Sequence, residues 1–174
     1  MDGQQIKFKD IAGKYNVKNN VAETFVLKQN YGARTNGERG KSFYRDDTKN
    51  LYGLIHAGWR GVVKEIHLRA LDKFMKLGVD LDKIKIILGP MIQNCCFEIK
   101  NDIIDNFKSK YIINRNHFKT VDLSAIVIDD LCEQGIIKNN IFSSDICSFH
   151  DDRCYSYRKN KTGNRMYSII AKRP

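Results

Sequence analysis

Five residues that could do chemistry together fall between His56 and Gly61: a His, the only Trp of the chain, an Arg and two Gly. The His56 imidazole can bind a metal or carry a proton, and Arg60 is a permanent cation with a fork of N–H donors. Glycine lets the backbone approach a ligand closely. The stretch predicts a site for phosphate or another anion, with His56 and Arg60 as catalytic candidates. A purely structural turn, in which Trp59 fills the core, stays open as the alternative.

The segments on either side should position these residues. Leu51–Ile55 is a short apolar run typical of a buried strand, and apolar residues recur at helical spacing from Val62 to Leu77. His56–Gly61 is therefore predicted to be a strand-to-helix turn. The first free N–H groups of such a helix favour an anion, which makes Gly61 a further phosphate-binding candidate.

Four ordered motifs resemble those of one family. His56–Gly61 is similar to the His-Ala-Gly-Trp-Arg-Gly signature of the laccase-domain proteins, multicopper polyphenol oxidases also described as zinc-dependent purine nucleoside phosphorylases. Gly89–Ile99 resembles that family's Gly-Pro-x-Ile-x-x-Cys-Cys-Tyr-Glu-Val. Asp122-Leu123 with Gly135-Ile136 resembles the family's Asp-Leu and Gly-Val pair. Ser156–Lys159 with Thr162–Met166 resembles its Ser-Tyr-Arg-Arg and Thr-Gly-Arg-Met ending. Together they cover roughly residues 46 to 172.

The resemblance implies both a fold and an activity. Alternating elements followed by a late hairpin favour an α+β domain with a mixed sheet. The family adds a layered α/β/β/α sandwich, grouped with the cytotoxic necrotizing factor catalytic domain. The implied enzyme cleaves adenosine, inosine or guanosine with phosphate, and related members deaminate adenosine or use methylthioadenosine. Arg158, in the last motif, becomes a candidate for binding the anion.

The N-terminal part departs from the family pattern. The family's zinc shell takes a His and a Cys from before the turn, but this chain has neither before His56. Only His56 is carried over as a metal ligand, whereas a catalytic zinc normally has three protein ligands. Copper fits less well, because blue copper needs a His, Cys, His set.

Three explanations for the missing ligands stay open. The N-terminal part is lost or replaced, other residues such as His150 or Cys95 complete the shell, or the protein is a degenerate member. We therefore divide the chain into a divergent or poorly ordered segment, 1–45, and a laccase-like domain, 46–174. Whether it is an enzyme is left open, the alternative being a truncated inactive member or a subunit with an incomplete metal site. Its incomplete sandwich would expose a sheet edge, which leaves a homo-oligomer open.

Composition narrows the class of protein. The chain has 174 residues and 42% hydrophobic content, which suits one folded domain. The sequence contains no apolar run long enough to span a membrane. Without a signal peptide pattern, we expect a soluble cytoplasmic protein. The net charge of +10 suits nucleic acid or an anionic substrate as a partner, but it is scattered, so we do not expect specific nucleic-acid binding. The resemblance implies a purine nucleoside and phosphate as partners, and we expect no membrane. The five Cys residues show no paired metal spacing, and adjacent Cys95 and Cys96 should face opposite ways if extended.

Further elements follow from local patterns. We expect Asp122 to cap a helix that runs to about Gln134, Gly78 and Gly135 to end helices, and His67 and His117 to be structural or exposed. The remaining expectations are strands at Phe25–Leu27, Lys85–Leu88 and Ile141–Cys147, a loop at Asn30–Gly40, a helix capped by Asn101, and a terminal hairpin of Tyr155–Arg158 with Met166–Ala171.

Overall fold

A five-stranded mixed sheet organises the molecule. The computed structural model describes residues 25–29, 33–36, 41–46, 51–161, 164 and 166–170. The strand order of the main sheet is β1-β4-β3-β5-β9. In that order the strands are β1 (Phe25–Gln29), β4 (Leu51–His56), β3 (Lys41–Asp46), β5 (Lys85–Leu88) and β9 (Ile141–Ser143).

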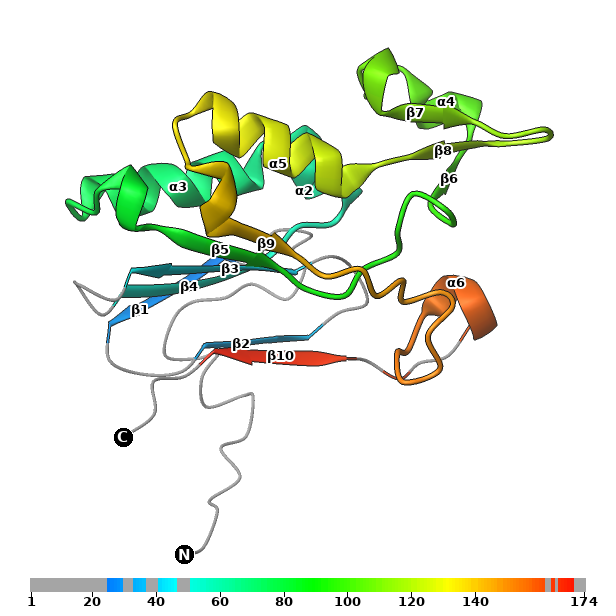
Figure 1. Ribbon diagram of the computed structural model, residues 1–174. Coiled ribbons are helices and arrows are strands. Elements are labelled where there is room, and N and C mark those ends of the chain that lie inside the picture. Colours follow the sequence, from blue (N-terminus) through cyan, green and yellow to red (C-terminus); the bar gives the residue numbers. More distant parts are fainter. Residues whose placement is uncertain are drawn as a thin grey trace, which may run out of the picture.

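Other elements cover the two faces of this sheet. Helices α2 (Trp59–Val63), α3 (Ile66–Lys76) and α5 (Leu123–Glu133) lie on one face (Figure 1). A two-stranded antiparallel sheet of β2 (Ala33–Asn36) and β10 (Tyr167–Ile170) lies on the other (Figure 1). Within the described residues the layers are therefore helix, sheet and sheet, and no helix covers the outer side of β2 and β10.

A third, small sheet extends beyond the end of α5 (Figure 1). Its order is β6 (Glu98–Ile99), β8 (Lys119–Val121), β7 (Ile112–Asn114). Short helices lie near it: α4 (Asn101–Ile104), a 3-10 turn at Ser109–Tyr111 and, after the β9 segment, α6 (Tyr157–Asn160). Two more 3-10 turns, Leu81–Lys83 and Lys138–Asn140, precede β5 and β9.

Strand direction places three chain segments at one edge of the main sheet. β3 is antiparallel to both β4 and β5, so β4 and β5 run the same way. β9 is parallel to β5. The carboxyl ends of β4, β5 and β9 therefore meet at one edge, the place where open sheets commonly bind ligands.

Large buried side chains fasten the helical layer to the sheet. The rings of Tyr44 and Phe74 lie 5.8 Å apart, and the Tyr44 hydroxyl donates to the His67 carbonyl oxygen at 3.1 Å. Burial raises the pKa of Tyr44 far above its ordinary value, so it remains a neutral donor. A Cβ on Gly53 would lie 2.9 Å from the Phe74 ring, so only glycine allows α3 to approach β4 this closely.

Several expected elements are confirmed. Strands β1, β4 and β5 occur where the sequence predicts them, and Gly78 and Gly135 end helices with positive φ angles of 74° and 95°. Asp122 caps α5, accepting from the Ala125 N–H at 2.9 Å. His117 is exposed.

The expected long helix from Val62 to Leu77 is wrong, because the chain breaks between α2 and α3 at Glu65, whose φ is +60°. The apolar period survives the break, so the sequence pattern could not reveal it. Asn101 is the first residue of α4, and no side chain caps that helix. β9 stops at Ser143, earlier than expected.

The expected terminal hairpin is also wrong. Tyr157–Asn160 forms α6, and β10 pairs with β2, which lies inside the predicted loop Asn30–Gly40. Four alternating residues are too few to separate a strand from one helical turn, and strand partners distant in the chain leave no local pattern. Of Thr162–Asn164, which would form the turn of that hairpin, only Asn164 lies within the described residues.

Candidate functional site

The β4–α2 corner, defined here as His56–Gly61, forms the predicted strand-to-helix turn. Gly58 is the N-cap of α2, and its carbonyl oxygen accepts from the Val62 N–H at 2.9 Å. Gly61 is buried, and a Cβ there would lie 3.2 Å from the Ile66 side chain. Packing therefore accounts for this glycine without a ligand. Since α2 has only five residues, its dipole is weaker than the expected long helix would provide.

Arg60 extends from this corner over the tryptophan. Its guanidinium carbon lies 4.6 Å from the Trp59 ring centroid, and the Arg60 side chain is exposed. On the inner side, the Trp59 ring lies 6.3 Å from the Phe107 ring. Trp59 thus fills part of the core and also supports a cation that solvent can reach.

Arg158 lies at a different place from Arg60. From α6 it donates to the Glu98 carbonyl oxygen at 2.9 Å, and its guanidinium carbon lies 4.6 Å over the Phe97 ring. These contacts fasten α6 to the segment after β5. Arg165, which belongs to the same motif as Arg158, lies outside the described residues.

A second group of reactive side chains lies at the same sheet edge. We define the cysteine–histidine cluster as Cys95, Cys96, Cys147 and His150, whose ligand-type atoms all lie within 4.8 Å of one another. Cys95 Sγ lies 3.3 Å from Cys96 Sγ and 3.7 Å from Cys147 Sγ. Cys96 Sγ lies 3.2 Å from His150 Nε2. Such a set of thiols and an imidazole could hold a metal ion.

Parallel pairing of β5 with β9 explains why these residues meet. The segments that follow the two strands leave the same edge of the sheet and stay in contact. The Ser148 N–H donates to the Met91 carbonyl oxygen at 2.9 Å, and the Gln93 side chain donates to the Ser144 carbonyl oxygen at 3.0 Å. Cys95 and Cys96 follow on one segment, and Cys147 and His150 on the other.

The thiols of the cluster differ in acidity. Burial, helped by the neighbouring thiols of Cys95 and Cys147, raises the pKa of the Cys96 thiol to about 12. Burial also opposes ionisation of Cys147, but the N–H groups of Gln93, Phe149 and His150 outweigh it and lower the pKa of that thiol. Cys147 is therefore more acidic than Cys96.

Sequence reasoning missed this arrangement, although it named Cys95 and His150 as residues that could complete a metal shell. Cys95 and Cys96 are expected to face opposite ways only if their segment is extended, and it is not: Asn94–Cys96 is a turn, closed by a hydrogen bond from the Cys96 N–H to the Gln93 carbonyl oxygen at 2.9 Å. Two signals were present in the sequence: the Cys95-Cys96 pair, and the Cys-x-x-His spacing from Cys147 to His150.

The family's zinc set does not fit this chain at His56. No His or Cys precedes His56 in the sequence, and His56 does not belong to the cysteine–histidine cluster. β3 separates β4 from β5, which places the ends of those strands roughly 10 Å apart. No step at His56 can therefore be derived through a zinc ion.

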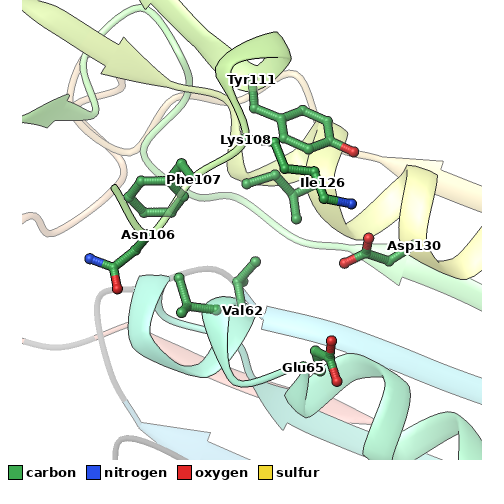
Figure 2. Close-up of a pocket in the computed structure, with 9 residues that line it drawn as sticks. Val62, Glu65, Asn106, Phe107, Lys108, Tyr111, Ile126 and Asp130 are labelled. Carbon is green, nitrogen blue, oxygen red and sulfur yellow. The ribbon is translucent and has the colours of Figure 1, made fainter. Parts of the chain in front are cut away.

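A pocket of about 130 Å³ lies elsewhere, between the α2–α3 break and α5 (Figure 2). Its walls carry Glu65 and Asp130 on one side and Phe107 and Asn106 on another (Figure 2). Ligand pockets usually measure about 300–1,000 Å³, so this one is too small for a nucleoside. None of the four predicted site residues lines it: His56, Arg60, Gly61 and Arg158.

Next to this pocket, His67 is structural as expected. It is fully buried, and its Nε2 lies 2.8 Å from Asp130 Oδ2. Burial lowers the pKa of His67 even though the Asp130 carboxylate and Glu65 act in the opposite sense.

None of the described helices is long and apolar enough to cross a membrane.

The sequence of this chain is similar to those of a phosphorylase and a deaminase. The purine nucleoside phosphorylase of Borreliella burgdorferi is 28% identical over 134 residues, which cover 74% of this chain and 58% of that protein. Adenosine deaminase RL5, from an unknown prokaryotic organism, is 30% identical over 111 residues, covering 59% of this chain and 42% of that protein. The chain thus spans only about half the length of these relatives.

Solved structures and a family sequence model agree with these relatives. YlmD from Geobacillus stearothermophilus has a TM-score of 0.71 at 19% identity, covering 87% of this chain and 57% of that one, which shows a shared fold. The sequence model described as multi-copper polyphenol oxidoreductase laccase matches residues 42–173. With that match over most of its length, the chain belongs to the multi-copper polyphenol oxidoreductase laccase family.

Proposed function

We propose that this protein acts as a purine nucleoside phosphorylase, cleaving adenosine, inosine or guanosine with phosphate. The observation that carries the proposal is the family match over residues 42–173, together with relatives that are named purine nucleoside phosphorylase. A purine nucleoside and phosphate are accordingly its partners, in the cytoplasm. The relative named adenosine deaminase adds deamination of adenosine as a second activity to assay, and methylthioadenosine is a further substrate to include.

The reaction places two demands on the site. The bond from the sugar carbon to the purine nitrogen breaks while a phosphate oxygen bonds to that carbon, so positive charge builds on the sugar and negative charge on the base. The enzyme must bind the phosphate dianion and must stabilise or protonate the leaving base.

The β4–α2 corner offers groups suited to both demands. Arg60 is an exposed guanidinium supported by Trp59, free to present N–H donors to phosphate. His56 stands at the end of β4, where its imidazole, once protonated, could deliver a proton to the leaving base. Gly61 keeps the backbone of this turn close to the strand, and we propose that it allows phosphate to approach.

Arg158 is the least direct of the proposed residues. Its guanidinium is already supported by Phe97 and bonded to the Glu98 carbonyl oxygen. We propose that it contributes positive charge at the mouth of the site. The likeness to the cytotoxic necrotizing factor catalytic domain also stays a prediction.

The test is phosphate-dependent release of free base from adenosine, inosine and guanosine by the purified chain. We expect His56→Ala to abolish release, and Arg60→Ala to raise the KM for phosphate by roughly 10- to 100-fold, the value of a lost charge-assisted hydrogen bond. Arg69→Ala removes another exposed arginine, on α3, and should leave the rate unchanged. A folded chain that releases no base, or that loses as much activity with Arg69→Ala as with Arg60→Ala, contradicts the proposal.

A further inference from the structure

The proposed reaction does not use Cys95, Cys96, Cys147 or His150. Their side chains nevertheless converge from two distant segments, with Cys95 and Cys147 lying 52 residues apart in the chain. We propose that these four residues bind one zinc ion in a tetrahedral site with three thiolates and one imidazole. This site is separate from the His56 corner and does not depend on the proposed function.

The spacing of the ligand atoms agrees with that geometry. Zinc–sulfur bonds of about 2.3 Å and zinc–nitrogen bonds of about 2.0–2.1 Å put tetrahedral sulfurs roughly 3.8 Å apart and sulfur and nitrogen roughly 3.5 Å apart. In the protein, Cys95 Sγ lies 3.7 Å from Cys147 Sγ, and Cys96 Sγ lies 3.2 Å from His150 Nε2. Cys95 Sγ and Cys96 Sγ lie closer, at 3.3 Å, and no pair of ligand atoms is more than 4.8 Å apart, so changes of up to about 1 Å would bring all four atoms onto one zinc ion.

The donor types select the metal. Thiolates and imidazole are ligands that zinc prefers, whereas calcium and magnesium take oxygen. Three thiolates bring a charge of −3, so a divalent cation leaves the site at −1 and offsets the repulsion between the thiolates. Four protein ligands leave no open position, which is typical of structural zinc rather than catalytic zinc.

Groups around the cluster orient the ligands. The Gln93 N–H lies 3.5 Å from Cys147 Sγ and points toward it, as expected for a thiolate ligand. The Asn94 side chain donates to Asp122 Oδ2 at 2.5 Å, which ties the turn bearing Cys95 and Cys96 to the N-terminus of α5. The zinc ion would therefore lock the segment after β5 to the segment after β9.

The experiment measures zinc in the tag-free chain, purified under reducing conditions and dialysed against a weak chelator. We expect one zinc ion per chain, and a cobalt-substituted form with sulfur-to-cobalt charge-transfer bands and tetrahedral d–d bands. Cys147→Ser and Cys95→Ser should each lower zinc affinity at least tenfold. Cys132→Ser, a thiol outside the cluster, and His56→Ala, the family's ligand, should each keep one zinc ion.

His150→Ala provides a second test in case the cysteine variants fail to fold. This ligand is exposed, so it can be replaced without leaving a cavity in the core. A folded His150→Ala chain should bind zinc more weakly and lose the nitrogen contribution to the cobalt spectrum. Any of three results overturns the proposal: zinc lost in His56→Ala but kept in Cys147→Ser, copper recovered in place of zinc, or no metal bound and a Cys95–Cys96 or Cys95–Cys147 disulfide found in its place.

Discussion

The β4–α2 corner and the cysteine–histidine cluster occupy the same edge of the main sheet but are assembled differently. The corner comes from one stretch, His56–Gly61, held by packing of α2 and α3 against β4. The cluster comes from two distant turns that meet because β5 and β9 are parallel neighbours. Local packing should therefore determine the stability of the corner. A bound ion and long-range strand pairing should determine the stability of the cluster.

Metal removal should give the largest difference between the two regions. With free zinc at about 1,000 times its dissociation constant, the ion adds about 4 kcal/mol to the free energy of unfolding. Urea unfolding with and without a strong chelator should show that loss in the wild-type chain and in His56→Ala. In Cys147→Ser, which binds zinc at least tenfold more weakly, the chelator effect should shrink by at least about 1.4 kcal/mol. A chelator effect that vanishes in His56→Ala instead would place the metal at the corner.

The packing under the corner can be tested at Gly53. Gly53→Ala pushes a methyl group against the Phe74 ring and should cost about 1–3 kcal/mol of stability. The smaller contact at Gly61 with Ile66 predicts a smaller loss for Gly61→Ala. Phe74→Leu should recover part of the loss in the double mutant, because the two changes share one space. Additive losses in denaturant unfolding would contradict this account of the close approach.

Asp122 connects the cluster to the helical layer. Asp122→Ala removes the α5 cap and should cost about 1 kcal/mol, whereas Asn at this position caps almost as well. Because Asp122 also holds Asn94, the alanine variant should bind zinc more weakly and leave Arg60-dependent phosphate binding unchanged. Equal unfolding midpoints for Asp122→Ala and Asp122→Asn would show that the cap contributes nothing.

The smallest expected effect is a pH dependence from His67. Because burial lowers its pKa in the folded state, the unfolded chain binds a proton more readily as pH falls below about 6.5. Stability should therefore decrease from pH 7 toward pH 5. Asp130 at 2.8 Å and Glu65 oppose the shift without reversing it.

The measurement for His67 needs a zinc-free background, since acid also displaces zinc from thiolates. We expect the decrease in Cys147→Ser and a shallower one in Cys147→Ser with His67→Leu. A stability that rises as the pH falls through this window would show that Asp130 dominates over burial.

Residues close in sequence could be predicted, and residues brought together by pairing could not. The corner, the Asp122 cap and the glycines that end α3 and α5 each depend on a few adjacent residues. The break at Glu65 leaves the apolar period intact, so the backbone change has no sequence signature.

The cysteine–histidine cluster and the β2–β10 pairing could not be predicted for a different reason. Both depend on which distant strands become neighbours, and no local pattern encodes that choice. The Cys-x-x-His spacing at Cys147–His150 was the one local clue, and it needed the turn at Asn94–Cys96 to complete four ligands.

X-ray absorption at the zinc edge of the tag-free chain tests the central claim most directly, because it counts the ligands of the bound ion. The structure predicts three sulfur atoms at about 2.3 Å and one nitrogen at about 2.0–2.1 Å. A shell dominated by nitrogen and oxygen, with one sulfur or none, would contradict a zinc site built from Cys95, Cys96, Cys147 and His150.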